Sequence, residues 1–431
     1  MTAPPPRPHR GAMTTTTPAA PSLRPPRPTL RRLVRAGGGP RYAAALLVDA
    51  LGSGLLRPFL LLYGIAVLHL DAAATGLAMT GGIVAGLACM PPLGRWLDRG
   101  ARSAAVAAAM LVRVVGVAVL LAAPTGSVAL FTLAALFLGI GNQAWPAAHA
   151  ALVTTVAEAH LRDTALAAAR SVRNAGLGLG ALLATVCLTG GAPALRALAA
   201  VSGAGFLAAA ALARSVKVTA GRAGRAPGAA AADGGTRRLR TVLLANVVYV
   251  FCLNVPEVAV PLVLVTVLHA SPAWPAAVFV ANTVLVVTLQ VPVTGWAAAR
   301  WPRARVLALS GAVLAASYLA FLPAAALGPL AVALVTIPCT LGEILYAGSA
   351  TPLVTALAPA GGLGRALSRL QFSTGLGLAL SPAVITALAP LALWPALAGA
   401  TLAAAAAVHR TGVRTAQPQV RSRAGRRPVV R

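Results

Sequence analysis

The segment GNQAWPAAHAALVTTVA at residues 141–157 recurs in altered form as GEILYAGSATPLVTALA at residues 342–358, an offset of 201 positions. Further matches follow in the same order: Gly94 with Gly295 and Arg102 with Arg303 at that offset, and Arg170 with Arg369 and residues 176–179 with 375–378 at an offset of 199. A two-residue deletion in a loop reconciles the two offsets. Because several matches in a fixed order indicate a duplication, the chain is predicted to consist of two halves that run in the same direction.

Each half is made of apolar blocks about 20 residues long, the length that an α-helix needs to cross a bilayer. Of the 431 residues, 58% are hydrophobic and 10% are charged, whereas soluble domains carry about 25% charged residues. The composition therefore excludes a soluble globular protein. Twelve blocks predict transmembrane helices, at residues 43–67, 74–94, 103–123, 127–148, 167–189, 194–213, 241–265, 275–297, 305–324, 328–350, 367–388 and 391–409.

We predict an all-α polytopic membrane protein whose twelve transmembrane helices form two parallel six-helix pseudo-repeats around a central cavity. Parallel repeats of this kind are one plan of membrane transporters, with the substrate bound near the midplane. The predicted units are a disordered basic cytoplasmic tail (1–40), a first bundle (41–213), a cytoplasmic linker (214–240), a second bundle (241–409) and a basic cytoplasmic tail (410–431).

The net charge of +28 would suit a nucleic-acid-binding protein, but the basic residues occur in clusters that alternate with the apolar blocks. Every second connection between blocks holds almost no Arg or Lys. Because basic loops remain on the cytoplasmic side, we expect both termini to lie in the cytoplasm. The protein is expected to be a monomer in the cytoplasmic membrane. The basic tails are expected to bind anionic lipid headgroups and no nucleic acid.

Three of the eight acidic residues fall inside predicted helices, namely Asp49, Glu257 and Glu343. A charged side chain at the membrane centre costs about 2.5–3.5 kcal/mol, so such residues usually face a cavity or a partner. These carboxylates are the proton-coupling candidates. Candidates for the cavity and the substrate site are polar and aromatic residues of the predicted helices, with Arg113 expected to pair with a carboxylate: Arg57, Arg113, Asn142, Trp145, Asn246 and Tyr346.

The loop between the second and third predicted helices reads GRWLDRGAR at residues 94–102. It resembles the signature of the major facilitator superfamily, a family with twelve helices and internal termini. The resemblance implies that the first, fourth, seventh and tenth helices line the cavity. The three acids fall on the first, seventh and tenth of them. The resemblance also implies that Gly94 permits close packing and that Asp98, Arg99 and Arg102 form a network that latches the halves together in the outward-facing state. Ala299 replaces the acid in the second half, so that copy is expected to have lost its latch.

The fifth predicted helix carries Arg170, Arg173 and alternating glycines at residues 176–180. In this it is similar to drug exporters of the family, especially actinobacterial ones. The glycines are expected to permit tight contact with another helix, and the two arginines to extend toward the cytoplasmic interface. The antiporter signature of the family is not intact here.

These observations predict proton-coupled export of small amphipathic compounds by alternating access, with the proton gradient as the energy source and no other cofactor. No Gly-Lys-Ser/Thr phosphate loop occurs, which excludes an ATP-driven pump as a single chain. No catalytic or metal-binding grouping stands out, so no enzyme is expected. Two alternatives remain open: a facilitator or importer of a small metabolite, and a non-transporting membrane sensor or assembly protein on the same scaffold.

Overall fold

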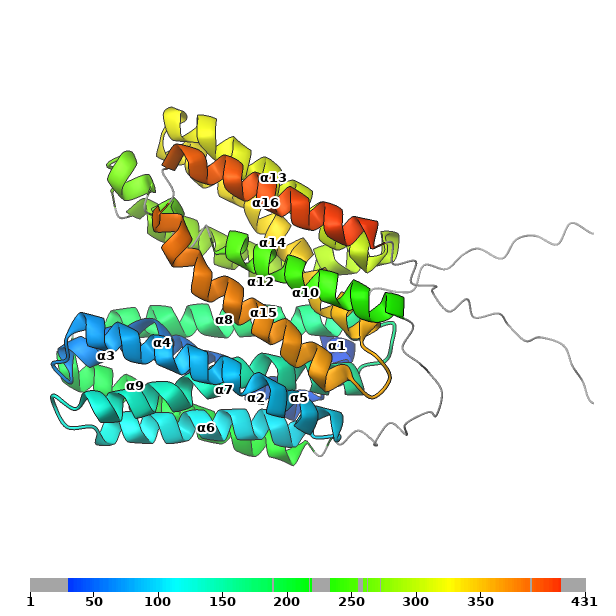
Figure 1. Ribbon diagram of the computed structural model, residues 1–431. Helices are drawn as coiled ribbons and strands as arrows, with labels where there is room; N and C mark the ends of the chain where they lie inside the picture. The colour runs from blue at the N-terminus through cyan, green and yellow to red at the C-terminus, as the bar shows by residue number, and fades with distance from the viewer. Residues whose placement is uncertain are drawn as a thin grey trace, which may run out of the picture.

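A computed structural model describes residues 30–187, 190–216, 218, 233–254, 259–261, 263–271, 273–387 and 390–411. These residues form two helical bundles that lie side by side (Figure 1). The first bundle contains α1 (Leu30–Ala36), α2 (Pro40–Leu56), η1 (Arg57–Phe59), α3 (Leu60–Ala66), α4 (Ala72–Ala88), α5 (Met90–Asp98), α6 (Ser103–Ala122), α7 (Val128–Val156), α8 (Arg162–Cys187) and α9 (Gly191–Ser215). The second contains α10 (Asp233–Leu253), the π-helical turn η3 (Val263–Val267), α12 (Ala273–Arg300), α13 (Arg303–Leu327), α14 (Pro329–Leu357), α15 (Leu363–Ala387) and α16 (Pro390–Arg410).

Eight helical stretches of the described residues are long and apolar enough to span a membrane: Pro40–Ala66, Ala72–Asp98, Ser103–Ala122, Val128–Val156, Gly191–Ser215, Ala273–Arg300, Arg303–Leu327 and Pro329–Leu357. The other predicted spans correspond to α8, to α10 with the turn η3, to α15 and to α16. In α8, Asp163, Arg170 and Arg173 interrupt the apolar sequence. The arrangement confirms the predicted all-α class and its two six-helix units.

Several helices of both bundles have arginines where they end on the same side of the molecule (right in Figure 1). We call this side the basic end. There Arg99 follows α5, Arg214 lies in the last turn of α9, and Arg300 and Arg410 end α12 and α16. The helices extend further at this end than predicted: α7 continues to Val156 and α14 to Leu357, α8 begins at Arg162 and α15 at Leu363. Hydropathy marks where the lipid ends, whereas backbone hydrogen bonding continues into the polar sequence beyond it.

The predicted disorder of residues 1–40 is wrong for the short helix α1, which contacts α8. Leu30, Leu33 and Val34 follow the i, i+3, i+4 spacing of a helix face, and Leu33 is buried. The linker is predicted to extend to residue 240, but residues 233–240 form the first turns of α10. Residues 1–29, 219–232 and 412–431, to which the rest of the tail and linker predictions apply, lie outside the described residues.

The alternating glycines of α8 bring this helix into close contact with α2. A Cβ atom on Gly176 would meet Ala50, and one on Gly180 would meet the backbone of Leu51 and Gly54. The contact confirms the expectation of tight helix packing at these glycines. On its other side α8 contacts α12 and α14 of the second bundle.

Candidate functional site

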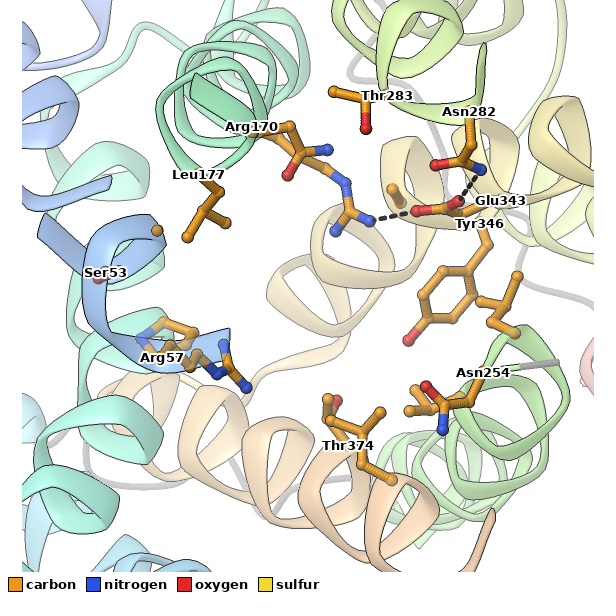
Figure 2. Close-up of a pocket in the computed structure, with 18 of the residues that line it drawn as sticks. Ser53, Arg57, Arg170, Leu177, Asn254, Asn282, Thr283, Glu343, Tyr346 and Thr374 are labelled. Carbon is orange, nitrogen blue, oxygen red and sulfur yellow. Dashed lines mark hydrogen bonds and ion pairs between the residues drawn. The ribbon is translucent and has the colours of Figure 1, made fainter. Parts of the chain in front are cut away.

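A cavity of about 850 Å³ lies between the two bundles (Figure 2). The first bundle contributes residues of α2, η1, α7 and α8 to its wall, and the second contributes residues of α10, α12, α14 and α15. The wall combines apolar side chains, among them Leu253, Val278 and Phe279, with polar ones. Such a mixture suits an amphipathic molecule, whose apolar part gains from burial and whose polar part is oriented by a few groups.

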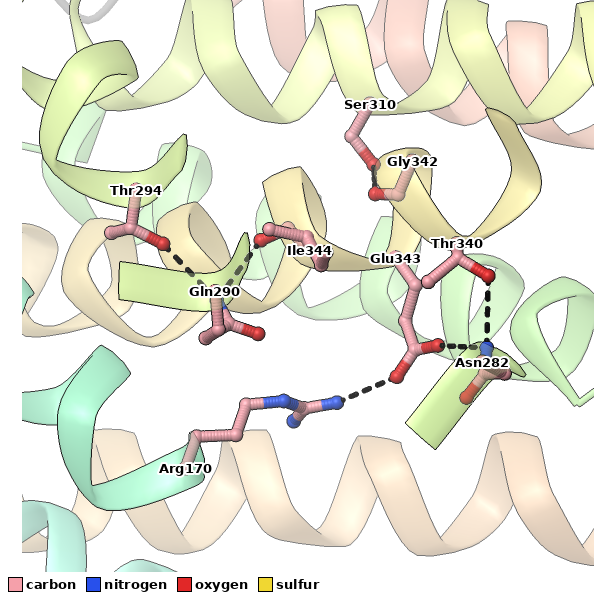
Figure 3. A network of polar contacts seen from close by, with 9 residues as sticks. All are labelled: Arg170, Asn282, Gln290, Thr294, Ser310, Thr340, Gly342, Glu343 and Ile344. Atoms are coloured by element: carbon pink, nitrogen blue, oxygen red, sulfur yellow. Dashed lines mark hydrogen bonds and ion pairs between the residues drawn. The ribbon is translucent and has the colours of Figure 1, made fainter. Parts of the chain in front are cut away.

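Glu343 of α14 lies on the cavity wall and bridges the two bundles (Figures 2 and 3). Its Oε1 accepts a hydrogen bond from Arg170 Nη2 of α8 at 3.0 Å, and its Oε2 accepts one from Asn282 Nδ2 of α12 at 3.4 Å. Asn282 also donates to Thr340 Oγ1 at 3.0 Å, which fixes the orientation of the amide. Arg170 therefore faces the other bundle. The expectation that its side chain extends toward the cytoplasmic interface of the membrane is wrong.

A second polar network supports the wall at Tyr346, one helical turn after Glu343. The Tyr346 hydroxyl donates to Asn246 Oδ1 at 2.6 Å. Asn246 Nδ2 in turn donates to Ser373 Oγ at 2.9 Å and to Thr374 Oγ1 at 3.1 Å, both on α15. Tyr346 and Thr374 line the cavity, whereas Asn246 is buried behind them.

Arg57 reaches the cavity because the first membrane-spanning helix changes conformation beside it. The 3-10 turn η1 interrupts α2 and α3 at Arg57, Pro58 and Phe59. Proline has no N–H to donate and clashes with the preceding turn of an α-helix, which explains the interruption at Pro58. Figure 2 shows the Arg57 side chain extending into the opening from the first bundle.

Asp49 does not reach the cavity, because it is fully buried inside the first bundle. Its Oδ1 pairs with Arg113 Nη2 of α6 at 2.5 Å, and its Oδ2 with Arg173 Nη1 of α8 at 3.1 Å. Arg113 also donates to Ser53 Oγ at 3.1 Å. Gly141 of α7 makes room for the Arg113 stem, since a Cβ there would overlap it. The prediction that Arg113 pairs with a carboxylate is confirmed. The expectation that Arg173 extends toward the cytoplasmic interface of the membrane is wrong.

Trp145 belongs to a stack of rings that leads away from this cluster. The Arg173 guanidinium lies 4.1 Å from the Trp145 ring centroid, a cation–π geometry. Trp145 stacks on His149 with ring centroids 4.7 Å apart, and the Tyr42 hydroxyl lies 2.7 Å from His149 Nδ1. Trp145 is buried and thus packs inside the first bundle rather than in the described cavity wall.

At the basic end, Asp98 connects the bundles. Its Oδ2 accepts from Arg365 Nε and its Oδ1 from the Gly364 backbone N–H, both at 2.6 Å. The adjoining backbones touch, because a Cβ on Gly94 would lie 3.0 Å from Arg365 Cα and one on Gly364 would overlap Leu97. This is the close packing that the loop signature implies for Gly94.

A second ion pair joins the bundles at the same end. Arg303 at the start of α13 donates to both carboxylate oxygens of Asp163 at the start of α8, at 2.8 and 3.1 Å. Arg303 is the repeat counterpart of Arg102, so the second copy takes part in an ion pair between the bundles although Ala299 replaces its acid. The acid comes from the opposite bundle instead of from position 299.

Arg99 and Arg102 do not bridge the bundles in the described structure. Arg99 is exposed after the end of α5. Arg102 is buried and donates from Nε to Thr155 Oγ1 of α7 at 2.7 Å and from Nη1 to the Leu97 carbonyl oxygen at 2.5 Å. Burial lowers the pKa of Arg102, and the nearby Asp98 partly opposes that shift. Arg102 therefore ties the loop to its own bundle.

The structure thus separates the predicted site residues into two groups. Glu343, Tyr346 and Arg57 line the cavity, whereas Asp49, Arg113, Trp145 and Asn246 are buried and do not appear in its described wall. Half-buried Asn142 is not part of that wall either, and Glu257 lies outside the described residues.

Sequence reasoning missed Asn282, which bonds Glu343, and Gln371 of α15, whose Nε2 donates to Gln143 Oε1 of α7 at 2.8 Å. For Asn282 a signal was present, because an amide inside an apolar block is costly unless it has a partner.

Comparisons with known proteins agree with this architecture. The family profile described as Major Facilitator Superfamily matches residues 42–382, whereas no curated protein sequence matches the chain. Solved structures with the same fold include a bacterial homologue of the iron transporter ferroportin in an outward-facing state, 12% identical, covering 86% of this chain and 97% of that one with a TM-score of 0.68.

The E. coli fucose:proton symporter FucP is 14% identical and covers 86% of this chain and 96% of its own, with a TM-score of 0.63. The proton:xylose symporter XylE is 12% identical and covers 88% of this chain and 94% of its own, with a TM-score of 0.67. At these identities the likeness concerns the fold, while the profile match extends over most of the chain. The chain therefore belongs to the Major Facilitator Superfamily and is a multi-pass membrane transporter rather than an enzyme.

Proposed function

We propose that the chain is a proton-coupled secondary transporter of small amphipathic compounds and that Glu343 carries the coupled proton. The observation that supports this proposal is the position of Glu343, on the wall of a cavity between two bundles and bonded to an arginine of the opposite bundle. Its side chain retains 24% exposure, so the carboxylate is accessible from the cavity. Asp49, by contrast, is enclosed by two arginines and exposes no surface.

Protonation of Glu343 would change the interaction between the bundles. The ionised carboxylate holds Arg170 across the boundary between the bundles, and a neutral carboxyl would hold it less strongly, because the attraction between two opposite charges would be lost. Alternating access requires the bundles to move relative to each other around a central site. A proton on Glu343 would thus alter the balance between their two arrangements.

The described contacts suit an outward-facing state. The inter-bundle ion pairs Asp98–Arg365 and Asp163–Arg303 gather at the basic end. The cavity wall, in contrast, extends to Pro275 in the first turn of α12, at the opposite end. We place the basic end in the cytoplasm and the protein in the cytoplasmic membrane, since arginine-rich connections remain on the cytoplasmic side.

Two directions of coupling are compatible with this site. Export by exchange for protons is the direction expected from the similarity of α8 to drug exporters. Uptake together with protons is the second candidate, and the Arg170–Glu343 pair favours it for a substrate that competes with Glu343 for the guanidinium. Two transporters with the same fold, FucP and XylE, are themselves proton symporters.

Purified protein in liposomes tests the proposal, with a pH-sensitive dye inside, the membrane potential clamped, and a set of cationic, neutral and anionic compounds added outside. Symport acidifies the lumen and antiport makes it alkaline, so the sign of the signal gives the direction. Glu343→Gln should abolish the pH change while the protein still binds the compound. Glu158→Gln is the matched control, because Glu158 is an exposed acid in the loop before α8.

Wild-type proton flux in Glu343→Gln would contradict the assignment of the proton to Glu343. Movement of a compound without any pH change would favour a facilitator. Folded protein that moves none of the compounds would favour the non-transporting alternative.

A further inference from the structure

The charged side chains of the described cavity wall are Arg57, Arg170 and Glu343. With Glu343 ionised, the described side chains of the wall carry one net positive charge. The cluster behind the wall adds to it, because Asp49 is shared by Arg113 and Arg173. A cleft lined by one sign of charge with apolar walls concentrates ligands of the opposite sign. This excess of arginine is unfavourable for a cation.

We infer that the transported compound is a small organic anion, a carboxylate attached to an apolar body, and that its charged group binds Arg170 when Glu343 is protonated. The inference rests on the transport function proposed above and specifies its substrate class. Arg57, which extends into the same opening (Figure 2), adds a second positive charge on the first bundle. Val278, Phe279 and Leu253 provide the apolar wall on the second bundle.

The geometry of Arg170 suits this role. Its side chain is 39% exposed toward the cavity, and among the described residues its guanidinium bonds Glu343 through Nη2 alone. Its Nε is buried and has no partner in the described structure. A guanidinium has five N–H donors in a rigid fork, and it can bind one carboxylate through two parallel hydrogen bonds. The single bond to Glu343 therefore leaves the fork with unused capacity.

The substrate carboxylate and Glu343 compete for the same guanidinium, and this competition couples the substrate to the proton. Protonation of Glu343 releases Arg170 to the anion, and by reciprocity an anion on Arg170 favours protonation of Glu343. The anion and the proton therefore bind together and move in the same direction. A cationic substrate would have the opposite sign of coupling, since it would bind Glu343 and displace the proton.

The surroundings of Glu343 contain no second charged group, among the described residues, that would replace Arg170 in this exchange. The titratable groups that face it are Arg170 from α8, Tyr318 from α13, and Cys339 and Tyr346 on α14 itself. The residues that α12, α10 and α15 contribute to the cavity wall are uncharged.

Binding to the purified wild-type protein tests the inference, with a series of apolar bodies of increasing size, each as a carboxylate, an amide and an amine. The smallest set is 3-phenylpropionate, 3-phenylpropanamide and 3-phenylpropylamine. Calorimetry in two buffers with different ionisation enthalpies gives both the affinity and the protons exchanged. We expect the carboxylates to bind best, with uptake of up to one proton per anion.

Variants identify the groups responsible. Arg170→Gln should weaken carboxylate binding by about 10- to 100-fold, the usual value of a bond to a charged group, with little effect on the amide. Glu343→Gln, which resembles the protonated acid, should bind the carboxylate at least as tightly as wild type and without proton uptake. Arg305→Gln removes an exposed arginine of α13 outside the cavity wall and should bind like wild type.

Preferential binding of the amines with proton release would overturn the inference and leave proton-coupled transport intact as antiport. It would also be overturned if no carboxylate binds more tightly than about 1 mM, or if carboxylates bind without proton uptake. Failure of the proposed function has a different signature, namely that no compound of any charge produces a pH change in the liposomes.

Discussion

Asp49→Asn is expected to destabilise the first bundle rather than to uncouple proton transport. The wild-type carboxylate is fully buried and bonds Arg113 and Arg173 at once. Asparagine has nearly the same shape but no charge, so both arginines would lose their counter-charge. Arg113 could not escape to water, because its side chain is 1% exposed and is surrounded by α2, α7 and Phe206.

The magnitude follows from the cost of breaking a buried ion pair. Removal of one partner costs about 3–5 kcal/mol, because the other charge is left uncompensated. At about 2–4 °C per kcal/mol for a unit of 150–250 residues, the six-helix bundle of residues 40–215 should lose roughly 6–20 °C of melting temperature. The double variant Asp49→Asn with Arg113→Gln should recover part of this loss, since one stranded charge is removed as well.

Thermal unfolding in detergent, followed by tryptophan fluorescence and by size-exclusion chromatography, measures the effect. Asp71→Asn is the matched control. Asp71 is the exposed N-cap of α4, where it accepts from the backbone N–H groups of Ala73 and Ala74, and asparagine serves as well as aspartate at that position. A melting temperature of Asp49→Asn within about 2 °C of wild type would refute the reasoning. If such a stable variant also lost its proton flux, Asp49 would be a proton site, as the sequence suggested.

Other predictions concern the basic end. Asp98→Arg and Arg365→Asp should each shift the protein toward the state that is open at this end. The double exchange should recover part of this shift, because it restores the ion pair but not the bond from the Gly364 backbone N–H to Asp98. Because the pair is partly exposed it is worth about 0.2–1 kcal/mol, so the populations should change by up to about fivefold. Asp163→Asn should act in the same direction through loss of the pair with Arg303. Gly364→Ala should open this end more strongly, because its Cβ overlaps the backbone of α5. Distances between spin labels on the exposed faces of α5 and α15 measure the effect in all five variants, and unchanged distances in the single variants would show that these contacts do not hold the end closed.

The sequence predicted the helices, the duplication and an inter-bundle role for the acid Asp98, because these depend on local hydropathy and on a short loop; that Asp98 acts as a latch stays a prediction. It did not predict which face of each helix points inward. Asp49 and Glu343 are equivalent as acids in apolar blocks, yet one is sealed inside a bundle and the other lines the cavity. The difference arises from Arg113, which meets Asp49 only after α2 and α6 have packed, and from Gly141 of α7, which makes room for the Arg113 side chain.

The partners of the interface charges were also beyond the sequence. Asp98 and Arg365 are 267 positions apart, and no periodic pattern connects them. The second pair is implicit in the repeat, once the two bundles exchange roles. If the loop after α5 meets the start of α15, then Arg303 in the equivalent loop should meet the start of α8, where Asp163 lies. An acid at position 299 would lie on the same bundle as Arg303, whereas the acid that pairs with Arg303 lies on the opposite one.

The two ion pairs of the basic end have one property in common: both acids, Asp98 and Asp163, belong to the first bundle, and both arginines, Arg303 and Arg365, belong to the second. Two bundles with the same fold could in principle associate with copies of themselves. With this distribution of charge, two first bundles would oppose acid to acid and two second bundles arginine to arginine, which disfavours both homodimers. The same residues that close the transporter would thus direct the assembly of a duplicated protein, and first and second bundles expressed as separate chains should copurify with each other in preference to themselves.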